Sequence, residues 1–217
     1  MADHNEIADR LHKLHPALIC DVLDGLGFRE SGLGPAIEPL RPEMQVAGRA
    51  FTLRWEEVDQ TPEEPYKTLL EAYEYMQPGD VLVMEAAEQT SAMWGELLSV
   101  AASVRGVTGA VMDGLVRDVE QILEVGFPVF ATGASPLDSA GRQDVVEYQT
   151  TIRCGAATVR PGDWVFGDLQ GVALIPQELL EQAVALAEEK DRGESTVRDE
   201  LLRGDDIGEV FGRHGIL

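Results

Sequence analysis

Apolar positions in the first quarter of the chain recur at the spacing of helices and then of a strand. The apolar residues of 5–14 lie three or four positions apart, which predicts an amphipathic helix. Pro16 opens a second apolar segment that ends at Gly25 or Gly27, and this order of proline and glycine is typical of a helix. Alternation of apolar and polar residues over 44–55 predicts a strand.

The middle of the chain repeats one rhythm, in which apolar runs of strand length alternate with segments of helix length. Strands are predicted over 80–86, 109–114 and 128–133, and helices over 66–76, 92–106 and 116–126. Strands and helices that alternate in this way form βα units, so at least part of the sheet is predicted to be parallel.

The last third of the chain has a different pattern. Residues 150–176 hold three β-like runs separated by turns, which predicts hairpins or a barrel-like antiparallel layer. An acidic helix is predicted over 177–204. No linker or repeat divides the sequence, so we interpret residues 1–217 as one α/β domain with a mixed sheet, in which parallel βα units join an antiparallel β layer.

The charge of the chain narrows the classes of partner. The formal net charge of the 217 residues is −22, whereas nucleic acids and anionic membranes attract clustered Lys and Arg, so we expect neither as a partner. No apolar run reaches the roughly 18 residues of a membrane span, and the first ten residues are polar, unlike a signal peptide. We therefore expect a cytoplasmic protein.

Two short segments, WGELL at 94–98 and DGLVRD at 113–118, lie at predicted junctions between elements. Open α/β sheets bind ligands at the carboxyl ends of their strands, and the free amides of a helix N-terminus suit a carboxylate. Gly95 would let the backbone approach a ligand closely, Arg117 carries a planar fork of donors, and Asp118 carries a hard oxygen for Mg²⁺ or Mn²⁺. Together they predict a site for a 2-oxo acid.

Each candidate residue also has a purely structural interpretation. Asp118 could be an acid in the first turn of a helix, where the helix dipole favours it. Arg117 could pair with Glu120 or Glu124 on the same helix. The remaining structural alternatives are a solvated Glu96, a core Trp94 and a turn at Asp113.

Several other catalytic classes lack their sequence signature. Cys20 and Cys154 form no CxxC pair, which leaves thiolate zinc and thioredoxin-type chemistry without support. The four histidines lie near the ends of the chain, and no phosphate-binding glycine motif of the GxxxxGKS/T or GxGxxG type follows a predicted strand. The three lysines lie outside both candidate segments, so a Schiff-base aldolase is not expected.

Four stretches of the chain resemble the RraA-like family, which includes the divalent-metal 4-hydroxy-4-methyl-2-oxoglutarate aldolases and oxaloacetate decarboxylases. They are CDVLDGLG, WGELLSVAASVRGVTGAVMDGLVRD, RPGDWVFGDLQGVALIP and VRDELLRGDDIGEVF, and the resemblance extends from about residue 7 to residue 211. In the aldolases of the family, twenty residues separate an acidic residue from an Arg-Asp pair, as they separate Glu96 from Arg117 and Asp118 here. Many members have Asp at the first position, and the Glu of this chain keeps the charge on a longer side chain.

The resemblance implies a fold and a role for each site residue. The fold would be an α/β/β sandwich of the swivelling-domain type, assembled as a homotrimer or a hexamer of two trimers, with the site between subunits. The substrate carboxylate would be held by the backbone amides of Gly95, Glu96, Leu97 and Leu98. Arg117 would bind the substrate and stabilise the pyruvate enolate, Asp118 would bind the metal directly, and Glu96 would orient a water on the metal.

The same resemblance places a glutamate from the C-terminal helix of the adjacent subunit near the metal, through water. Glu194 is our candidate, with Glu188 and Glu189 as alternatives. The implied function is a class II pyruvate aldolase that cleaves 4-hydroxy-4-methyl-2-oxoglutarate-type 2-oxo acids and decarboxylates oxaloacetate, with Mg²⁺ or Mn²⁺ as cofactor. The alternative is a non-enzymatic RraA-type regulator of ribonuclease activity that acts by protein–protein contact. Such regulators tend to lack the first acidic residue, so Glu96 favours the enzyme.

Overall fold

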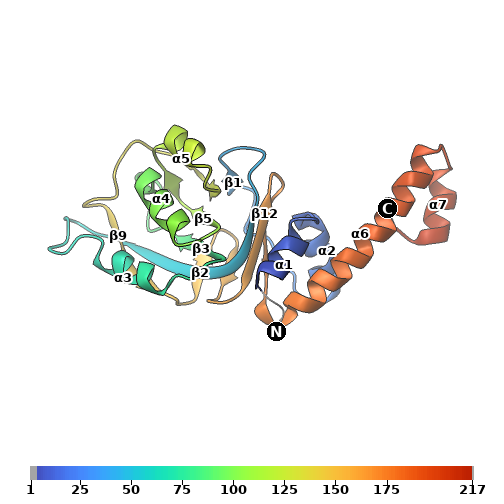
Figure 1. The fold of residues 1–217 in the computed structure, drawn as a ribbon, viewed down its shortest axis with the longest axis horizontal. Helices are drawn as coiled ribbons and strands as arrows, with labels where there is room; N and C mark the ends of the chain where they lie inside the picture. The colour runs from blue at the N-terminus through green and yellow to red at the C-terminus, as the bar shows by residue number, and fades with distance from the viewer. Residues whose placement is uncertain (1–3, 217) are drawn as a thin grey trace.

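The computed structural model describes residues 4–216, which form one large mixed sheet, two smaller sheets and the helices around them (Figure 1). The helices are α1 (His4–Leu11), α2 (Pro16–Gly25), α3 (Lys67–Tyr75), α4 (Glu96–Val104), α5 (Val119–Val125), the 3₁₀ turn η1 (Gln177–Leu179), α6 (Leu180–Leu202) and α7 (Ile207–His214). The strands are β1 (Glu38–Pro39), β2 (Val46–Glu57), β3 (Asp80–Glu85), β4 (Ala92–Trp94), β5 (Gly109–Asp113), β6 (Leu115–Val116), β7 (Val129–Ala131), β8 (Gly133–Ala134), β9 (Gln143–Tyr148), β10 (Ile152–Cys154), β11 (Ala157–Val159), β12 (Trp164–Asp168) and β13 (Gly171–Ile175).

The large sheet has eight strands in the order β1-β7-β5-β3-β2-β12-β13, with β9 paired to the second half of β2. Strands β2, β3, β5 and β7 pair in parallel with one another, while β1, β9, β12 and β13 pair antiparallel. Residues Val81 to Met84 of β3 are fully buried, as expected for a parallel strand that is covered on both faces. The predicted α/β class, with parallel βα units and an antiparallel β layer, is therefore confirmed.

Two groups of helices cover the large sheet (Figure 1). Helices α3, α4 and α5 pack beside β2, β3 and β5, where Leu69, Ala102 and Ile122 belong to one buried cluster. Helices α1 and α2 and the first half of α6 pack around Trp164 and Phe166 of β12. The rest of α6 projects away from the sheet, on the opposite side of the molecule from α4 and α5, and α7 folds back along it.

Two predicted helices begin later than their sequence pattern indicates. Strand β4 replaces the first turn of the helix predicted over 92–106, and β6 replaces the first turn of the helix predicted over 116–126. These strands pair in parallel with each other and with β8 in a separate three-stranded sheet. Met93 and Val116 are buried in this pairing, so long-range backbone hydrogen bonds replace the local helical ones.

The structure also contains elements that the sequence pattern does not predict. Strand β9 pairs with β2 just before the block 150–176, and that block holds four strands in place of the expected three. Helix α7 follows the predicted C-terminal helix, and Asp206 caps it by accepting the amides of Gly208 and Glu209 at 2.9 and 3.1 Å. An eight-residue helix leaves too few turns for a clear periodic signal.

A bilayer crossing requires a long apolar helix, and none of the helices within residues 4–216 meets that requirement.

Candidate functional site

The three-stranded sheet β4-β6-β8 brings the two candidate segments together. All three strands run in parallel, so the chain leaves them at the same edge. Gly95 follows β4, Arg117 follows β6, and the loop after β8 leads to Asp138. The main-chain amide of Arg117 donates to the carbonyl of Trp94 at 2.9 Å, which fixes the first two segments to each other.

Asp118 adopts a strained backbone conformation and turns its carboxylate toward a helix other than its own. Its φ is 57° and its ψ is 38°, in the left-handed region that residues other than glycine enter at an energetic cost. The carboxylate makes no capping hydrogen bond to α5, and its Oδ2 accepts the amide of Glu96 at the start of α4, at 3.4 Å. The backbone of Asp118 thus lies at the N-cap position of α5 while its side chain turns to the N-terminus of α4, whereas the structural alternative had Asp118 as a first-turn acid of the helix predicted over 116–126.

The Asp118 carboxylate lies against the backbone of Gly95. A Cβ atom at residue 95 would lie 2.7 Å from Oδ2 of Asp118 and 3.3 Å from Cγ of Arg117, both tighter than ordinary contacts. The φ of Gly95 is −159°, an extended conformation that any residue can adopt, so space alone selects the glycine. The close approach of a ligand to Gly95 stays a prediction, and the group that lies against Gly95 in the structure is the Asp118 carboxylate.

Arg117 lies between two carboxylates. Its Nη1 is 2.8 Å from Oδ2 of Asp138, and its Nε is 3.5 Å from Oδ2 of Asp118. The hydrogen bond to Asp138 raises the pKa of Arg117. Burial alone would raise the pKa of Asp138, but the amide of Ala140 and the guanidinium of Arg117 outweigh burial and hold that pKa below its ordinary value. The structural alternative, in which Arg117 pairs with a glutamate of α5, is not what the structure contains.

The first turn of α4 presents free amides to the same place. The first hydrogen bond within this helix runs from the amide of Ser99 to the carbonyl of Gly95, so the amides of Glu96, Leu97 and Leu98 precede it. Only that of Glu96 is partly engaged, through its 3.4 Å contact with Asp118. Leu97 and Leu98 line the adjoining cavity. A carboxylate ligand would therefore meet uncompensated N–H groups and the positive end of the helix dipole.

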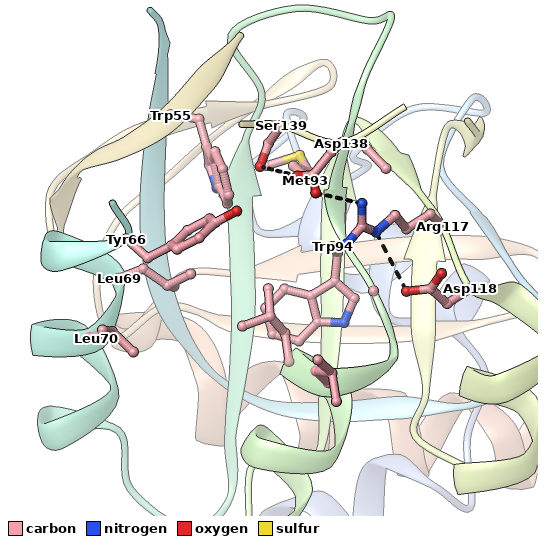
Figure 2. A pocket seen from close by; sticks show the side chains of 14 residues that line it. Trp55, Tyr66, Leu69, Leu70, Met93, Trp94, Arg117, Asp118, Asp138 and Ser139 are labelled. Atoms are coloured by element: carbon pink, nitrogen blue, oxygen red, sulfur yellow. Dashed lines mark hydrogen bonds and ion pairs between the residues drawn. The ribbon is translucent and has the colours of Figure 1, made fainter. Parts of the chain in front are cut away.

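A cavity of about 260 Å³ adjoins these groups. Figure 2 shows Arg117, Asp118 and Asp138 on one side of it, with Trp55 and Tyr66 across from them. The other apolar residues that line the cavity are Leu69, Leu70, Ala92, Met93, Trp94, Leu97 and Leu98. The site is therefore a cleft with one charged wall and one apolar wall.

Sequence reasoning missed Asp138, Trp55 and Tyr66. Asp138 follows the strand predicted over 128–133, just as Gly95 follows β4 and Arg117 follows β6. Its position after the end of a strand could therefore have identified it as a candidate site residue. Tyr66 has a positive φ of 61° at the N-terminus of α3 and comes from a distant part of the chain. Trp55 belongs to β2, whose pairing with β9 was not predicted, so no local pattern placed it beside the site.

The remaining predicted site residues are not brought to the cavity within one chain. The side chain of Glu96 is partly exposed and does not line the cavity. Glu194 lies on α6, 3.8 Å from Lys190, and α6 is on the far side of the molecule from α4 (Figure 1). Glu188 is bound by Arg10 of α1 at 2.7 and 2.9 Å.

At Trp94 the structural alternative is confirmed, whereas Asp113, which was expected in a turn, is the last residue of strand β5. Trp94 is buried, donates its indole N–H to Ser99 Oγ at 2.8 Å and stacks on Phe127, so it is a core residue as well as part of the cavity wall. Asp113 accepts the amide of Gly155 at 3.1 Å and thereby joins β5 to the β10–β11 hairpin. Asp113 therefore serves the fold and does not line the cavity.

The donor set at the cavity suits one class of metal ion. Within residues 4–216, no group of three or more His, Cys, Asp or Glu side chains is arranged to enclose a metal. Asp138 and Asp118 both pair with Arg117, at 2.8 and 3.5 Å, and Asp118 alone also lies beside the open first turn of α4. Mg²⁺ and Mn²⁺ accept one protein carboxylate and take their other ligands from water and substrate, so Asp118 fits such an ion and does not fit zinc.

Fold and site together define a mixed α/β protein with a small-molecule cleft at the carboxyl ends of parallel strands. A family model described as RraA-like, aldolase/RraA, matches residues 17–174. The chain belongs to the RraA-like family.

Three similar proteins show the range of the family. An uncharacterised protein of Methanocaldococcus jannaschii is 37% identical over 59% of this chain and 62% of its own length. A protein of Halalkalibacterium halodurans, provisionally named as a 4-hydroxy-4-methyl-2-oxoglutarate aldolase, is 32% identical over 79% of this chain and 77% of its own length. The crystal structure of Streptomyces coelicolor RraAS2, described as an unusual member of the RNase ES inhibitor RraA protein family, has a TM-score of 0.80 at 28% identity, covering 91% of this chain and 98% of that one.

Proposed function

We propose that this protein is a divalent-metal-dependent carbon–carbon lyase that releases pyruvate from 4-substituted 2-oxo acids. The reference substrates are 4-hydroxy-4-methyl-2-oxoglutarate, by aldol cleavage, and oxaloacetate, by decarboxylation. The observation that carries the proposal is the Arg117 guanidinium held beside Asp118 and the free amides of α4. The provisional aldolase name of the relative from Halalkalibacterium halodurans supports the same class of reaction.

Both reactions build negative charge on the ketone oxygen of the substrate while the C3–C4 bond breaks. The amides of Leu97 and Leu98 and the Glu96 amide bind the substrate carboxylate at the start of α4. Arg117 then faces the 2-oxo group and stabilises the enolate oxygen as charge develops there. When Mg²⁺ or Mn²⁺ is bound, it supplies Lewis-acid stabilisation of that same charge, and Asp118 is the residue that holds it.

Asp138 and Gly95 position the catalytic groups. Asp138 holds Nη1 of Arg117 at 2.8 Å, so the guanidinium keeps one orientation before the substrate arrives. Gly95 leaves the space in which the Asp118 carboxylate lies. The buried residues Trp55 and Leu69 on the opposite wall lower the polarity beside Arg117, which strengthens its electrostatic contribution.

The direct test is pyruvate release from oxaloacetate and from 4-hydroxy-4-methyl-2-oxoglutarate, measured with a coupled lactate dehydrogenase assay. We expect release in the presence of Mg²⁺ or Mn²⁺ and its loss on addition of EDTA. The rate should return when excess Mg²⁺ is added back. Absence of metal-dependent release from every 4-substituted 2-oxo acid tried would refute the lyase proposal.

A second candidate function is regulation of a ribonuclease by protein contact. The similarity to Streptomyces coelicolor RraAS2 favours it, because that protein is described within an RNase ES inhibitor family. The net charge of −22 would let the surface compete with RNA for a basic partner. Inhibition of a purified ribonuclease by this chain, together with no metal-dependent pyruvate release, would decide in favour of the regulator.

We further propose that the protein assembles as a homotrimer or a hexamer in which α6 of one subunit reaches the site of its neighbour. Within one chain, helix α6, which carries Glu194, lies on the far side of the molecule from α4 (Figure 1), so Glu194 can act at the metal only from an adjacent copy. Size-exclusion chromatography with light scattering measures the assembly. A strictly monomeric protein that retains full activity would remove Glu194 from the mechanism.

A further inference from the structure

We propose that the site prefers 2-oxo acids whose far end is uncharged and apolar over those that carry a second carboxylate there. The inference rests on the proposed lyase function and narrows its substrate class. It follows from how charge is distributed around the cavity, which Figure 2 displays.

The two ends of the cavity differ in chemistry. Arg117 and Asp118 lie at the end where the amides of α4 begin, and this end would anchor the carboxylate and 2-oxo group that all candidate substrates share. Across the cavity lie Trp55 and the α3 residues Leu69 and Leu70, which present carbon to the substituent at C4. The substrate tail therefore meets an apolar surface.

Within one chain, a second carboxylate would find no cation at the apolar end. Among the described residues that line the cavity, Arg117 is the single cationic side chain, and it already pairs with Asp118 and Asp138. Arg142 approaches from outside, donates to the main-chain carbonyl of Asp138 at 2.8 Å and does not line the cavity. A carboxylate moved from water to the Trp55 side would lose hydration without gaining a charged partner.

The polar atoms on the apolar side are neutral. Tyr66 extends its ring and hydroxyl into the cavity, and Ser139 lies at its edge with its hydroxyl 3.4 Å from Asp138. The indole N–H of Trp55 is buried and has no acceptor among residues 4–216. Neutral donors accommodate an alkyl, aryl or hydroxyl-bearing tail, and, unlike the first turn of α4, they bring no helix dipole to a carboxylate.

The inference is tested with a pair of aldol substrates that differ in one group. In 4-hydroxy-4-methyl-2-oxopentanoate, a methyl replaces the tail carboxylate of 4-hydroxy-4-methyl-2-oxoglutarate. In both, the C4 hydroxyl loses its proton, the C3–C4 bond breaks, and its electron pair forms the pyruvate enolate, which takes up a proton at C3. The products are pyruvate and acetone from the first compound and two pyruvates from the second. We expect kcat/KM to be at least about tenfold higher for the methyl compound.

A binding measurement separates this inference from the lyase proposal. Two unreactive ligands, 5-methyl-2-oxohexanoate and 2-oxoglutarate, have closely similar shapes and differ in whether the tail is isopropyl or carboxylate. Trp55 and Trp94 line the cavity, so quenching of tryptophan fluorescence reports occupancy with Mn²⁺ present. We expect at least about tenfold tighter binding of the isopropyl ligand. This result would support the inference even if no pyruvate were released from any substrate, an outcome that would refute the lyase proposal alone.

Leu70→Arg adds a cation at the apolar end and should reverse the preference. Leu70 is 62% exposed, so an arginine fits there without disturbing the core, and Val104→Arg on an 82% exposed residue outside the cavity is the matched control. The measured quantity is the affinity for 5-methyl-2-oxohexanoate divided by the affinity for 2-oxoglutarate. We expect Leu70→Arg to lower this ratio at least about tenfold and Val104→Arg to leave it unchanged. Equal or tighter binding of 2-oxoglutarate by the wild-type protein, or binding of neither ligand, would overturn the inference.

Discussion

The Nη1 atom of Arg117 lies 2.8 Å from Oδ2 of Asp138, although the two residues are separated by a helix and two strands in the sequence. The same guanidinium reaches Asp118 with Nε at 3.5 Å. One side chain thus connects the ends of two adjacent parallel strands, and its orientation depends on both carboxylates. The consequences for the proposed reaction can be measured.

Arg117→Lys should lower kcat by on the order of 10²–10³ with the fold intact. A lysine carries a single nitrogen on a flexible stem, so it cannot reproduce the two separate contacts that Nε makes with Asp118 and Nη1 makes with Asp138. Steady-state kinetics of pyruvate release and a circular dichroism spectrum make the test. Arg41→Lys, at a half-exposed arginine that pairs with Glu43, is the control and should behave as wild type. Near-wild-type kinetics of Arg117→Lys would contradict the assigned role.

Asp118→Asn should abolish binding of Mn²⁺ while preserving the backbone. Asparagine tolerates the left-handed conformation at φ 57°, so the variant removes the charge without changing the turn. Isothermal titration calorimetry with Mn²⁺, in the presence of oxalate as an enolate mimic, measures the effect. Glu120→Gln, at an exposed carboxylate two residues away, is the control and should give the same heat of Mn²⁺ binding as the wild type. Unchanged Mn²⁺ affinity in Asp118→Asn would exclude Asp118 as the metal ligand.

Gly95→Ala should reduce activity at least about tenfold through steric displacement alone. The added Cβ would lie 2.7 Å from Oδ2 of Asp118, so the carboxylate has to move out of its position beside α4. Gly25→Ala, where a Cβ has no neighbour within 4 Å, is the matched control and should leave kcat unchanged. The proposed geometry would be wrong if both alanine variants turned over at the wild-type rate.

The stability of the fold should depend on pH through the Glu88 carboxylate. Partial burial raises its pKa, but hydrogen bonds from Ser91 and Thr90 outweigh burial and lower that pKa to about 2. A depressed pKa contributes stability above the ordinary value of 4.5, and this contribution is lost as the pH falls from 4.5 toward 2. Glu88→Gln should therefore lower the thermal midpoint by a few degrees at pH 7.

The difference in thermal midpoint between Glu88→Gln and the wild type should shrink as the pH approaches 2, because protonation removes the charge from the native Glu88 side chain. Thermal unfolding followed by circular dichroism across this range measures it. Glu57→Gln, on an exposed residue at the end of β2, serves as the control. A difference in thermal midpoint that stays constant with pH would show that the charge on Glu88 does not stabilise the fold.

The sequence pattern was sufficient where one local rule governs the backbone. The long apolar run of β3 and the helix that starts at Pro16 were predicted because buried parallel strands and proline-initiated helices leave a periodic or compositional signal. The pattern failed at β4, where Ala92 to Trp94 continue a helical spacing but pair with β6. Backbone pairing to a distant strand leaves no mark in the local spacing.

The sequence by itself determined the fold class and predicted that Gly95 lies beside Arg117 and Asp118. Only the tertiary structure decided that Asp118 turns to α4, that Asp138 orients Arg117, and that Trp55 and Tyr66 close the cavity with an apolar wall. The reason is physical. Residue types and spacings set local conformation, whereas the direction of a side chain and its distant partners depend on how the strands pair and the helices pack.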